Sequence, residues 1–382
     1  MRKILILLGT TALAACSGGG PTTVGGAAVT GGGGAGATNP HTFVNPTDPK
    51  TYQATGGVQS YEFSTTPGSQ QYNQLYAGDA NTARDNGYQI TYNPRDGIFD
   101  LALKATKAGV DISTRFQDPV HRTAFGGARE PQSGTPDLTA KVVIYFQNGS
   151  SSGVFNTDGY TQQSQTFFYQ KPGTTTSYVT YAGFIRNKIT QANRDNGSGG
   201  TFLQTDYDRK RGVFVYGERS TSNAVPRSGT GTFTGQMLGS LIYNPLLDVD
   251  PSTPSFFQWM DGTSTTTVDF GANTFTLALA GTLGAPQFDL HSSQIAQLSA
   301  GATFAAAGSG RVDLVNAGGF LGQINSASLT FGGITNNLII AGSSIDGAFY
   351  GPTAQEVGGG FRIVGGTPDQ RIDILGVFTG AR

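Results

Sequence analysis

The chain has little of what catalysis and metal binding usually need. It contains one cysteine in 382 residues, which cannot form a disulfide within the chain. Its three histidines, His41, His121 and His291, lie in separate segments without the spacing of metal ligands. His121 lies in a long polar stretch and is the best placed of the three to contact a haem or a metal, although a lone loop histidine is usually solvated. Because no catalytic constellation is visible, we expect a protein that is not an enzyme and that holds no cofactor and no metal.

Charge is also scarce. Only 13% of the residues are charged and the formal net charge is −1, which gives no electrostatic reason to bind nucleic acid. Long helical stretches rich in alanine, leucine, glutamate and lysine are missing. The chain has instead 57 glycines, 24 phenylalanines and 15 tyrosines, a composition typical of a β-rich exported protein. Its length suits two domains.

The N-terminus has the features of an export signal. A basic start at residues 2–3 precedes an apolar run over residues 4–12, which is too short for a bilayer core of about 30 Å. Small residues then lead to Ala15 and Cys16. Because Cys16 is the only cysteine and sits where a lipidated cysteine is required, we predict a lipoprotein signal peptide over residues 1–15, cleavage between Ala15 and Cys16, and a lipid on the Cys16 thiol. An ordinary secretory signal with an incidental cysteine is the alternative.

Residues 16–42 are rich in glycine and are expected to form a flexible tether. Ordering such a segment costs too much entropy, and about 20 residues of it reach roughly 25 Å. Ser17 after the cysteine favours the outer membrane over retention at the inner membrane, by analogy with lipoprotein sorting. We therefore expect a folded body that is anchored to a membrane by lipid and does not span it.

Residues 43–228 contain short β-like runs separated by polar segments. The sequence Asn-Pro-Arg-Asp-Gly at residues 93–97 is a strong turn signal and predicts a hairpin over residues 88–103. Residues 105–139 and 186–211 are expected to be long loops.

Three short charged motifs can be interpreted either as structural or as functional residues. The Asp-x-Asp pairs at 206–208 and 248–250 could supply oxygen ligands to Ca²⁺, but they fit turn residues better. The basic run at 209–211 is expected to be a solvated face.

Residues 229–382 show the alternating pattern of a barrel wall. A strand opens at Gly229, a hairpin with its turn at 271–273 follows, and a second hairpin is expected with its turn at 308–310. Roughly eight strands close a barrel that side chains fill and that leaves no unpaired edge. A transmembrane barrel is disfavoured because the strands are short and glycine-rich and lack paired aromatic girdles.

The most informative stretch lies near the C-terminus. A strand ends at Tyr350, and Thr353 with Glu356 fits a capping box on a single helical turn. Glycines 358–360 would then supply the unusual backbone angles needed to enter the next strand. The order Gly-Ala-Phe-Tyr-Gly-Pro-x-Ala-x-Glu-Val-Gly-Gly-x-Phe over residues 347–361, followed by Gly-Val-Phe at 376–378, resembles the closing hairpin of the transferrin-binding-protein-B-like β-barrel family.

The resemblance implies an all-β fold, with an N-terminal antiparallel-sheet handle domain over residues 43–228 and an eight-stranded antiparallel β-barrel over residues 229–382. Residues 178–181, 214–217 and 225–229 resemble the end of the handle and the start of the barrel. Where the family often has Gly-x-Trp, this chain has Gly-Phe-Ile at 183–185, so the match is looser in the handle.

The resemblance also implies a function. Such proteins are outer-membrane-anchored, cell-surface lipoproteins that bind an iron or haem source, either a host carrier protein or a solute, beside an outer-membrane receptor or translocator. Ligand-binding residues of the family lie on variable loops and are not transferred to this chain. A structural or adhesin-like lipoprotein without a small-molecule ligand is the alternative, and a secreted β-rich enzyme ranks third.

Overall fold

The computed structural model describes residues 42–66, 72–77, 87–105, 110–118, 130–132, 134–244, 256–285, 300–366 and 371–382. The predicted signal peptide and tether, with Ala15 and Cys16, lie outside these residues, as do all three histidines and the Asp-x-Asp pair at 248–250. Within the described ranges no helix is long and apolar enough to cross a membrane. Residues 41–382 form one compact unit.

The described chain is all-β, as predicted, and its strands form three sheets. The first half, residues 43–228, is called the handle below and contains two of them. The four-stranded sheet has the order β1 (Lys50–Gln53), β4 (Gln89–Asn93), β5 (Ile98–Ala105) and β6 (Val110–Gln117). The six-stranded sheet has the order β3 (Tyr72–Ala77), β2 (Thr55–Thr65), β10 (Thr201–Gly217), β9 (Val179–Asp195), β8 (Thr161–Gln170) and β7 (Val143–Ser152).

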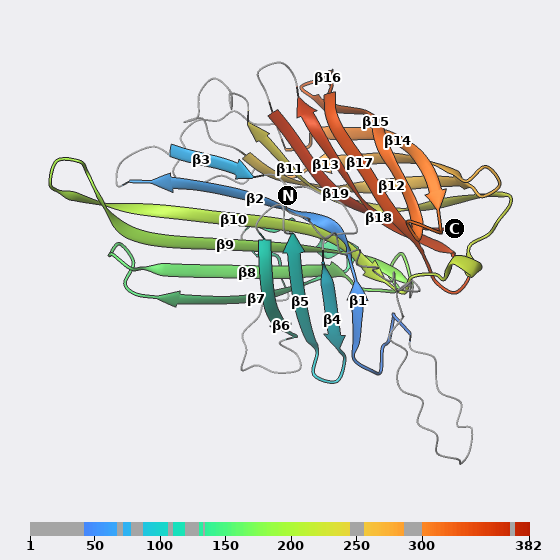
Figure 1. Cartoon of the computed structure of the whole chain (residues 1–382), viewed down its shortest axis with the longest axis horizontal. Coiled ribbons are helices and arrows are strands. Elements are labelled where there is room, and N and C mark those ends of the chain that lie inside the picture. Colours follow the sequence, from blue (N-terminus) through green and yellow to red (C-terminus); the bar gives the residue numbers. More distant parts are fainter. Residues whose placement is uncertain are drawn as a thin grey trace, which may run out of the picture. The chain divides into compact units, whose positions relative to one another are not determined.

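The part of the six-stranded sheet nearest Gly217 is buried on both faces. Phe184 and Phe214 pack in a cluster with residues of the four-stranded sheet, whereas Val213 and Val215 pack on the other face against barrel residues such as Leu375. Because side chains alternate along a strand, a sheet covered on both sides needs apolar residues at consecutive positions. This explains the continuous apolar run before Gly217 and places the sheet between its two neighbours (Figure 1).

The barrel is closed by eight antiparallel strands, which confirms the predicted architecture. Pairing of β14 with β15 joins the two ends of the ladder, and the short β16 (Ile334–Asn337) adds to β15 outside the closed ring. The closed strands are β11 (Thr230–Asn244), β12 (Phe256–Asp269), β13 (Thr274–Leu283), β14 (Thr303–Asp313), β15 (Gly319–Phe331), β17 (Ile339–Tyr350), β18 (Glu356–Gly366) and β19 (Arg371–Ala381).

Side chains fill the barrel interior. Along β13 every second residue is buried, and Phe275, Leu277 and Leu279 enter the core beside Phe320 and Phe361. Eight strands leave an interior of a size that side chains occupy completely. The inside of the barrel is therefore packed core, and the chain must bind any ligand elsewhere.

Several sequence predictions of local structure are confirmed and others are wrong. The turns at 93–97 and 271–273 join β4 to β5 and β12 to β13, as predicted. Residues 186–211 are not a loop, because they form most of the β9–β10 hairpin. Residues 308–310 are not a turn, because they continue β14, where the pairing with β15 only shifts register. Part of the other expected loop, at 110–117, is strand β6.

Candidate functional site

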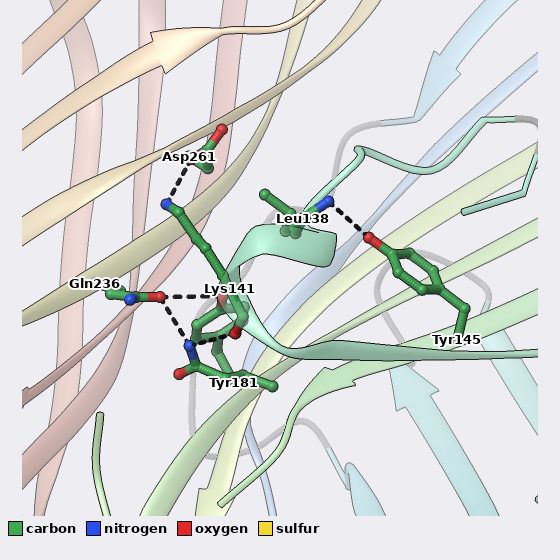
Figure 2. A network of polar contacts seen from close by, with 7 residues as sticks. Leu138, Lys141, Tyr145, Tyr181, Gln236 and Asp261 are labelled. Atoms are coloured by element: carbon green, nitrogen blue, oxygen red, sulfur yellow. Dashed lines mark hydrogen bonds and ion pairs between the residues drawn. The ribbon is translucent and has the colours of Figure 1, made fainter. Parts of the chain in front are cut away.

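Polar side chains join the handle to the flank of the barrel (Figure 2). The Lys141 ammonium contacts the Asp261 carboxylate of β12 at 2.5 Å, and the Tyr181 hydroxyl donates to the Gln236 side-chain oxygen of β11 at 3.1 Å. Tyr145 donates to a backbone carbonyl and accepts the Leu138 N–H at 2.9 Å; burial raises the pKa of Tyr145 to about 12, so the hydroxyl stays protonated. The Lys141 and Tyr181 contacts fix the handle on two barrel strands, whereas the Tyr145 bonds stay within the handle and hold the segment that carries Lys141.

Glu356 makes a second connection, and it is not the capping residue that the sequence predicts. Its carboxylate is 4% exposed and accepts the backbone N–H groups of Ser177, Tyr178 and Val179 at 2.6, 2.7 and 3.0 Å. Burial raises the pKa of Glu356, and the three N–H donors oppose that rise. The first residue of β18 thus holds the start of the handle strand β9.

The turn before Glu356 is built differently from the predicted helical turn. Gly351 and Ala354 have positive φ angles of 86° and 55°, and the Gln355 side-chain oxygen accepts the N–H of Thr353. Glycines 358–360 lie within β18 and none has a positive φ, so the predicted unusual backbone angles are wrong and the role of Gly358 is not backbone freedom. A Cβ there would lie 2.8 Å from the side chain of Val179, so the absence of a side chain allows the handle to approach.

The charged motifs at 206–211 are neither turn residues nor a solvated face. All six residues lie in β10. Although burial opposes it, hydrogen bonds from Ser64, Gln204 and Arg194 lower the pKa of Asp206. Asp208 contacts cationic side chains on both of its oxygens, at 2.5 and 2.8 Å. No group of acidic, histidine or cysteine side chains in the described chain could hold a metal ion, and these carboxylates are engaged by protein donors.

Two of the basic residues in this run are buried, and only Arg211 faces the barrel; the Lys210 ammonium donates to Ser60 and Asp208 within the handle. Lys210 and Arg211 are each 6% exposed. The Arg211 guanidinium lies 4.4 Å from the ring centre of Phe257 and 5.1 Å from that of Trp259. Both rings belong to β12, so this basic residue also contributes to the junction.

The best candidate for a protein-binding surface is the turn between β7 and β8, residues 153–160, called the handle tip here. Val154 and Phe155 are 68% and 60% exposed, among the most exposed large apolar side chains described. The tip is held in place, because Asn156 N–H donates to the Gln191 side chain at 2.8 Å and Gly159 N–H donates to its backbone oxygen at 3.0 Å. A fixed, exposed aromatic side chain beside polar groups is the composition of a binding hot spot.

Sequence reasoning did not identify the handle tip. Two adjacent apolar residues in a Gly- and Asn-containing turn have no strand or helix period. The available signal was the placement of Val154 and Phe155 between Gly153 and Asn156, where a turn leaves side chains unburied. Gly153 and Asn156 both have positive φ angles, 77° and 65°.

Comparison with known families identifies the barrel. Residues 225–382 match the model of the C-lobe and N-lobe β-barrels of transferrin-binding protein B. This range begins within a few residues of the predicted start of the barrel at 229. No curated protein matches the sequence.

Solved structures of similar proteins are distant. Intact Ap-TbpB, with N and C lobes, is 12% identical, with 88% of this chain and 79% of that chain covered and a TM-score of 0.29. A mutant of the vaccine antigen transferrin-binding protein B from Haemophilus parasuis Hp5 is 13% identical with the same coverage and TM-score. The isotype 1 protein from serogroup B Neisseria meningitidis is 11% identical, with 84% and 58% covered and a TM-score of 0.27. Such low TM-scores support no inference about this chain.

Proposed function

Because the barrel of this chain belongs to the family of transferrin-binding protein B barrels, we propose that the chain is a non-enzymatic, outer-membrane-anchored lipoprotein that captures an iron source. The family match over residues 225–382 is the observation that carries this proposal. The iron source would be a host carrier protein of the transferrin kind or a haem source, presented to an outer-membrane receptor or translocator.

The described residues support binding on the outside of the molecule. The barrel interior is filled by side chains, and the flank formed by β11, β12 and β19 is covered by the handle. The handle tip remains as a fixed apolar surface, with Phe155 packed edge-on against Tyr160 at 5.3 Å. We therefore propose the tip as a contact for the carrier protein.

Lipid anchoring belongs to the same proposal. Cys16 would carry the acyl chains after cleavage at Ala15, and the glycine-rich residues 17–42 would separate the folded body from the membrane. In this proposal the handle and barrel would lie at the cell surface. Mass spectrometry of the mature N-terminus tests it, and an unmodified Cys16 would refute it.

The binding test uses a full chain with Cys16→Ser, immobilised and exposed in turn to iron-loaded transferrin, haemoglobin and haem. Binding of one of them supports the proposal. Phe155→Ala is expected to weaken binding of a protein carrier at least tenfold, because truncating an aromatic hot spot typically costs about 2 kcal/mol or more. Val315→Ala is the matched control, since Val315 is 90% exposed in the β14–β15 turn of the barrel.

The outcomes test capture of an iron source separately from contact through the handle tip. If none of the three probes binds at micromolar concentration, capture of an iron source is wrong and the structural or adhesin-like alternative takes its place. If a carrier binds equally to the Phe155→Ala and Val315→Ala variants, the function stands and the handle tip is not the contact.

A further inference from the structure

The handle contains an aromatic pocket of about 310 Å³ that none of the features above uses. Its lining comes from the segment at 43–46, strands β1, β4, β5, β8 and β10, and the connection after β8. Tyr52, Phe99 and Tyr216 are buried, whereas Tyr92 and Tyr169 are half-buried. The volume lies at the lower end of the range for small-molecule sites.

The rings of the pocket are held in fixed positions by one another. Tyr92 stacks on Phe99 with ring centres 4.4 Å apart, and Phe99 lies 5.0 Å from Tyr169. Phe43 packs edge-on against Tyr52 and Tyr216 at 5.2 and 5.6 Å. An aromatic lining of this kind favours a ligand with a flat ring, which can stack or pack edge-on without reorganising the site.

The tyrosine hydroxyls are hydrogen-bond donors at neutral pH. Burial, together with the neighbouring tyrosines, raises the pKa of Tyr216, and burial is also the main cause of the raised pKa values of Tyr52 and Tyr92. Tyr216 is 2% exposed and lines the pocket. A protonated tyrosine hydroxyl in the lining can donate a hydrogen bond to a ligand oxygen.

The charge at the pocket selects the sign of the ligand. Lys171 supplies the sole charged side chain of the described lining, and it is exposed at the rim. Two carboxylates outside the lining, Glu218, which is paired with Lys50, and Asp118, also contribute to the raised pKa values of Tyr52 and Tyr92, after burial. An anionic group would be attracted by the Lys171 ammonium and would accept from the tyrosine hydroxyls, whereas a cation would be repelled.

We propose that this pocket binds a planar aromatic carboxylate of one or two rings. The rings would pack among Phe99, Tyr92 and Tyr169, and the carboxylate would accept from Tyr216 and face Lys171. The site belongs to the handle alone and does not depend on the capture of a carrier protein.

Isothermal titration calorimetry of the full chain carrying Cys16→Ser tests the proposal with three probes. Naphthoate has the ring and the charge, naphthyl methanol has only the ring, and cyclohexane carboxylate has only the charge. We expect naphthoate to bind at one site, at least fivefold tighter than either of the others. Lys171→Gln should weaken naphthoate about fivefold, equivalent to about 1 kcal/mol, and should leave naphthyl methanol unchanged.

Two further variants make the result decisive. Tyr216→Phe keeps the ring and removes only the hydroxyl, so it should fold normally and weaken naphthoate by a similar factor. Lys188→Gln, on β9 outside the pocket lining, makes the same substitution as Lys171→Gln and should have no effect. The proposal is overturned if naphthoate gives no binding up to millimolar concentration. Equal affinity of wild type, Lys171→Gln and Tyr216→Phe would also overturn it.

Discussion

Replacing Glu356 by alanine should destabilise the protein far more than loss of a helix cap would. The carboxylate is buried and accepts three backbone N–H groups from a segment 177–179 residues earlier in the chain. Alanine would remove all three bonds and leave a gap between β18 and the start of β9. The Glu356 side chain therefore joins the handle to the barrel and does not cap the turn that precedes it.

The magnitude follows from the exposure of the three donors. Ser177 is exposed, so water can replace the carboxylate at its N–H, whereas Tyr178 is half-buried and Val179 is fully buried. A hydrogen bond to a charged group contributes about 1.5–3 kcal/mol, and a buried donor without a partner costs about 1–3 kcal/mol. Counting mainly the Tyr178 and Val179 donors, we expect Glu356→Ala to cost about 3–5 kcal/mol. A lost cap would cost about 1 kcal/mol.

Urea unfolding, followed by circular dichroism and by fluorescence of Trp259 near the junction, measures this cost. Glu130→Ala removes an exposed carboxylate and should change the free energy of unfolding by less than about 0.5 kcal/mol. Glu356→Gln keeps the shape of the side chain and one good acceptor. Its loss in free energy of unfolding should therefore lie between those of Glu130→Ala and Glu356→Ala. A loss below 1 kcal/mol for Glu356→Ala would refute the role of Glu356 in holding the handle.

The pH dependence of the same residue has a definite sign. Burial raises the pKa of Glu356 above its usual 4.5, despite the N–H donors. The folded state therefore holds the proton to a higher pH than the unfolded chain, and this contribution to stability is full below pH 4.5 and lost as pH rises through the folded pKa. On acidification from pH 7 toward 4.5, wild type should gain stability relative to Glu356→Gln. An unchanged difference across that range would contradict the raised pKa.

Three more predictions concern the barrel and the anchor. Gly359→Val should cost about 1–3 kcal/mol in unfolding experiments, because a Cβ there would lie 2.5 Å from a backbone oxygen of the neighbouring strand; Gly342→Val, where a Cβ meets nothing within 4 Å, should cost much less. Cys16→Ser should move the protein from the membrane fraction to the soluble periplasm, as fractionation would show; membrane retention would argue against the anchor. The fragment 229–382 should unfold cooperatively with a β-type spectrum; a molten, protease-sensitive fragment would disprove the predicted domain boundary.

Features that depend on local sequence could be predicted, and features that depend on distant pairing could not. The Asn-Pro-Arg-Asp-Gly turn at 93–97 determines its own geometry, and Gly97 takes the positive φ of 61° that the signal requires. Residues 186–211 pair with one another as the β9–β10 hairpin, which β8 flanks up to residue 190 and β2 flanks from residue 205, and their polar residues show no apolar period. The predicted loop was therefore wrong because a polar segment without an apolar period gives no local signal of a strand.

The same reasoning explains Glu356. A Thr-x-x-Glu pattern before a strand is compatible with a capping box and with a carboxylate that faces outward from the turn. The donors that decide between them, at 177–179, are remote in sequence and belong to the other half of the chain. The family motif over 347–361 located the right residues, but their contacts required the fold.

The packing of the handle limits where this protein can bind anything. A barrel filled by Phe275, Phe320 and their neighbours has no room for a ligand, and its flank is buried against a sheet that is itself covered on its other face. Among the described residues of the handle, accessible apolar groups occur at Val142, at the handle tip around Phe155, and in the pocket that Tyr216 lines. The handle tip is convex and fixed, which suits a protein partner, and the pocket is concave and aromatic, which suits a small planar molecule. Because the two share no residue and use different chemistry, Phe155→Ala should leave naphthoate binding unchanged. Tyr216→Phe should in turn leave carrier binding unchanged.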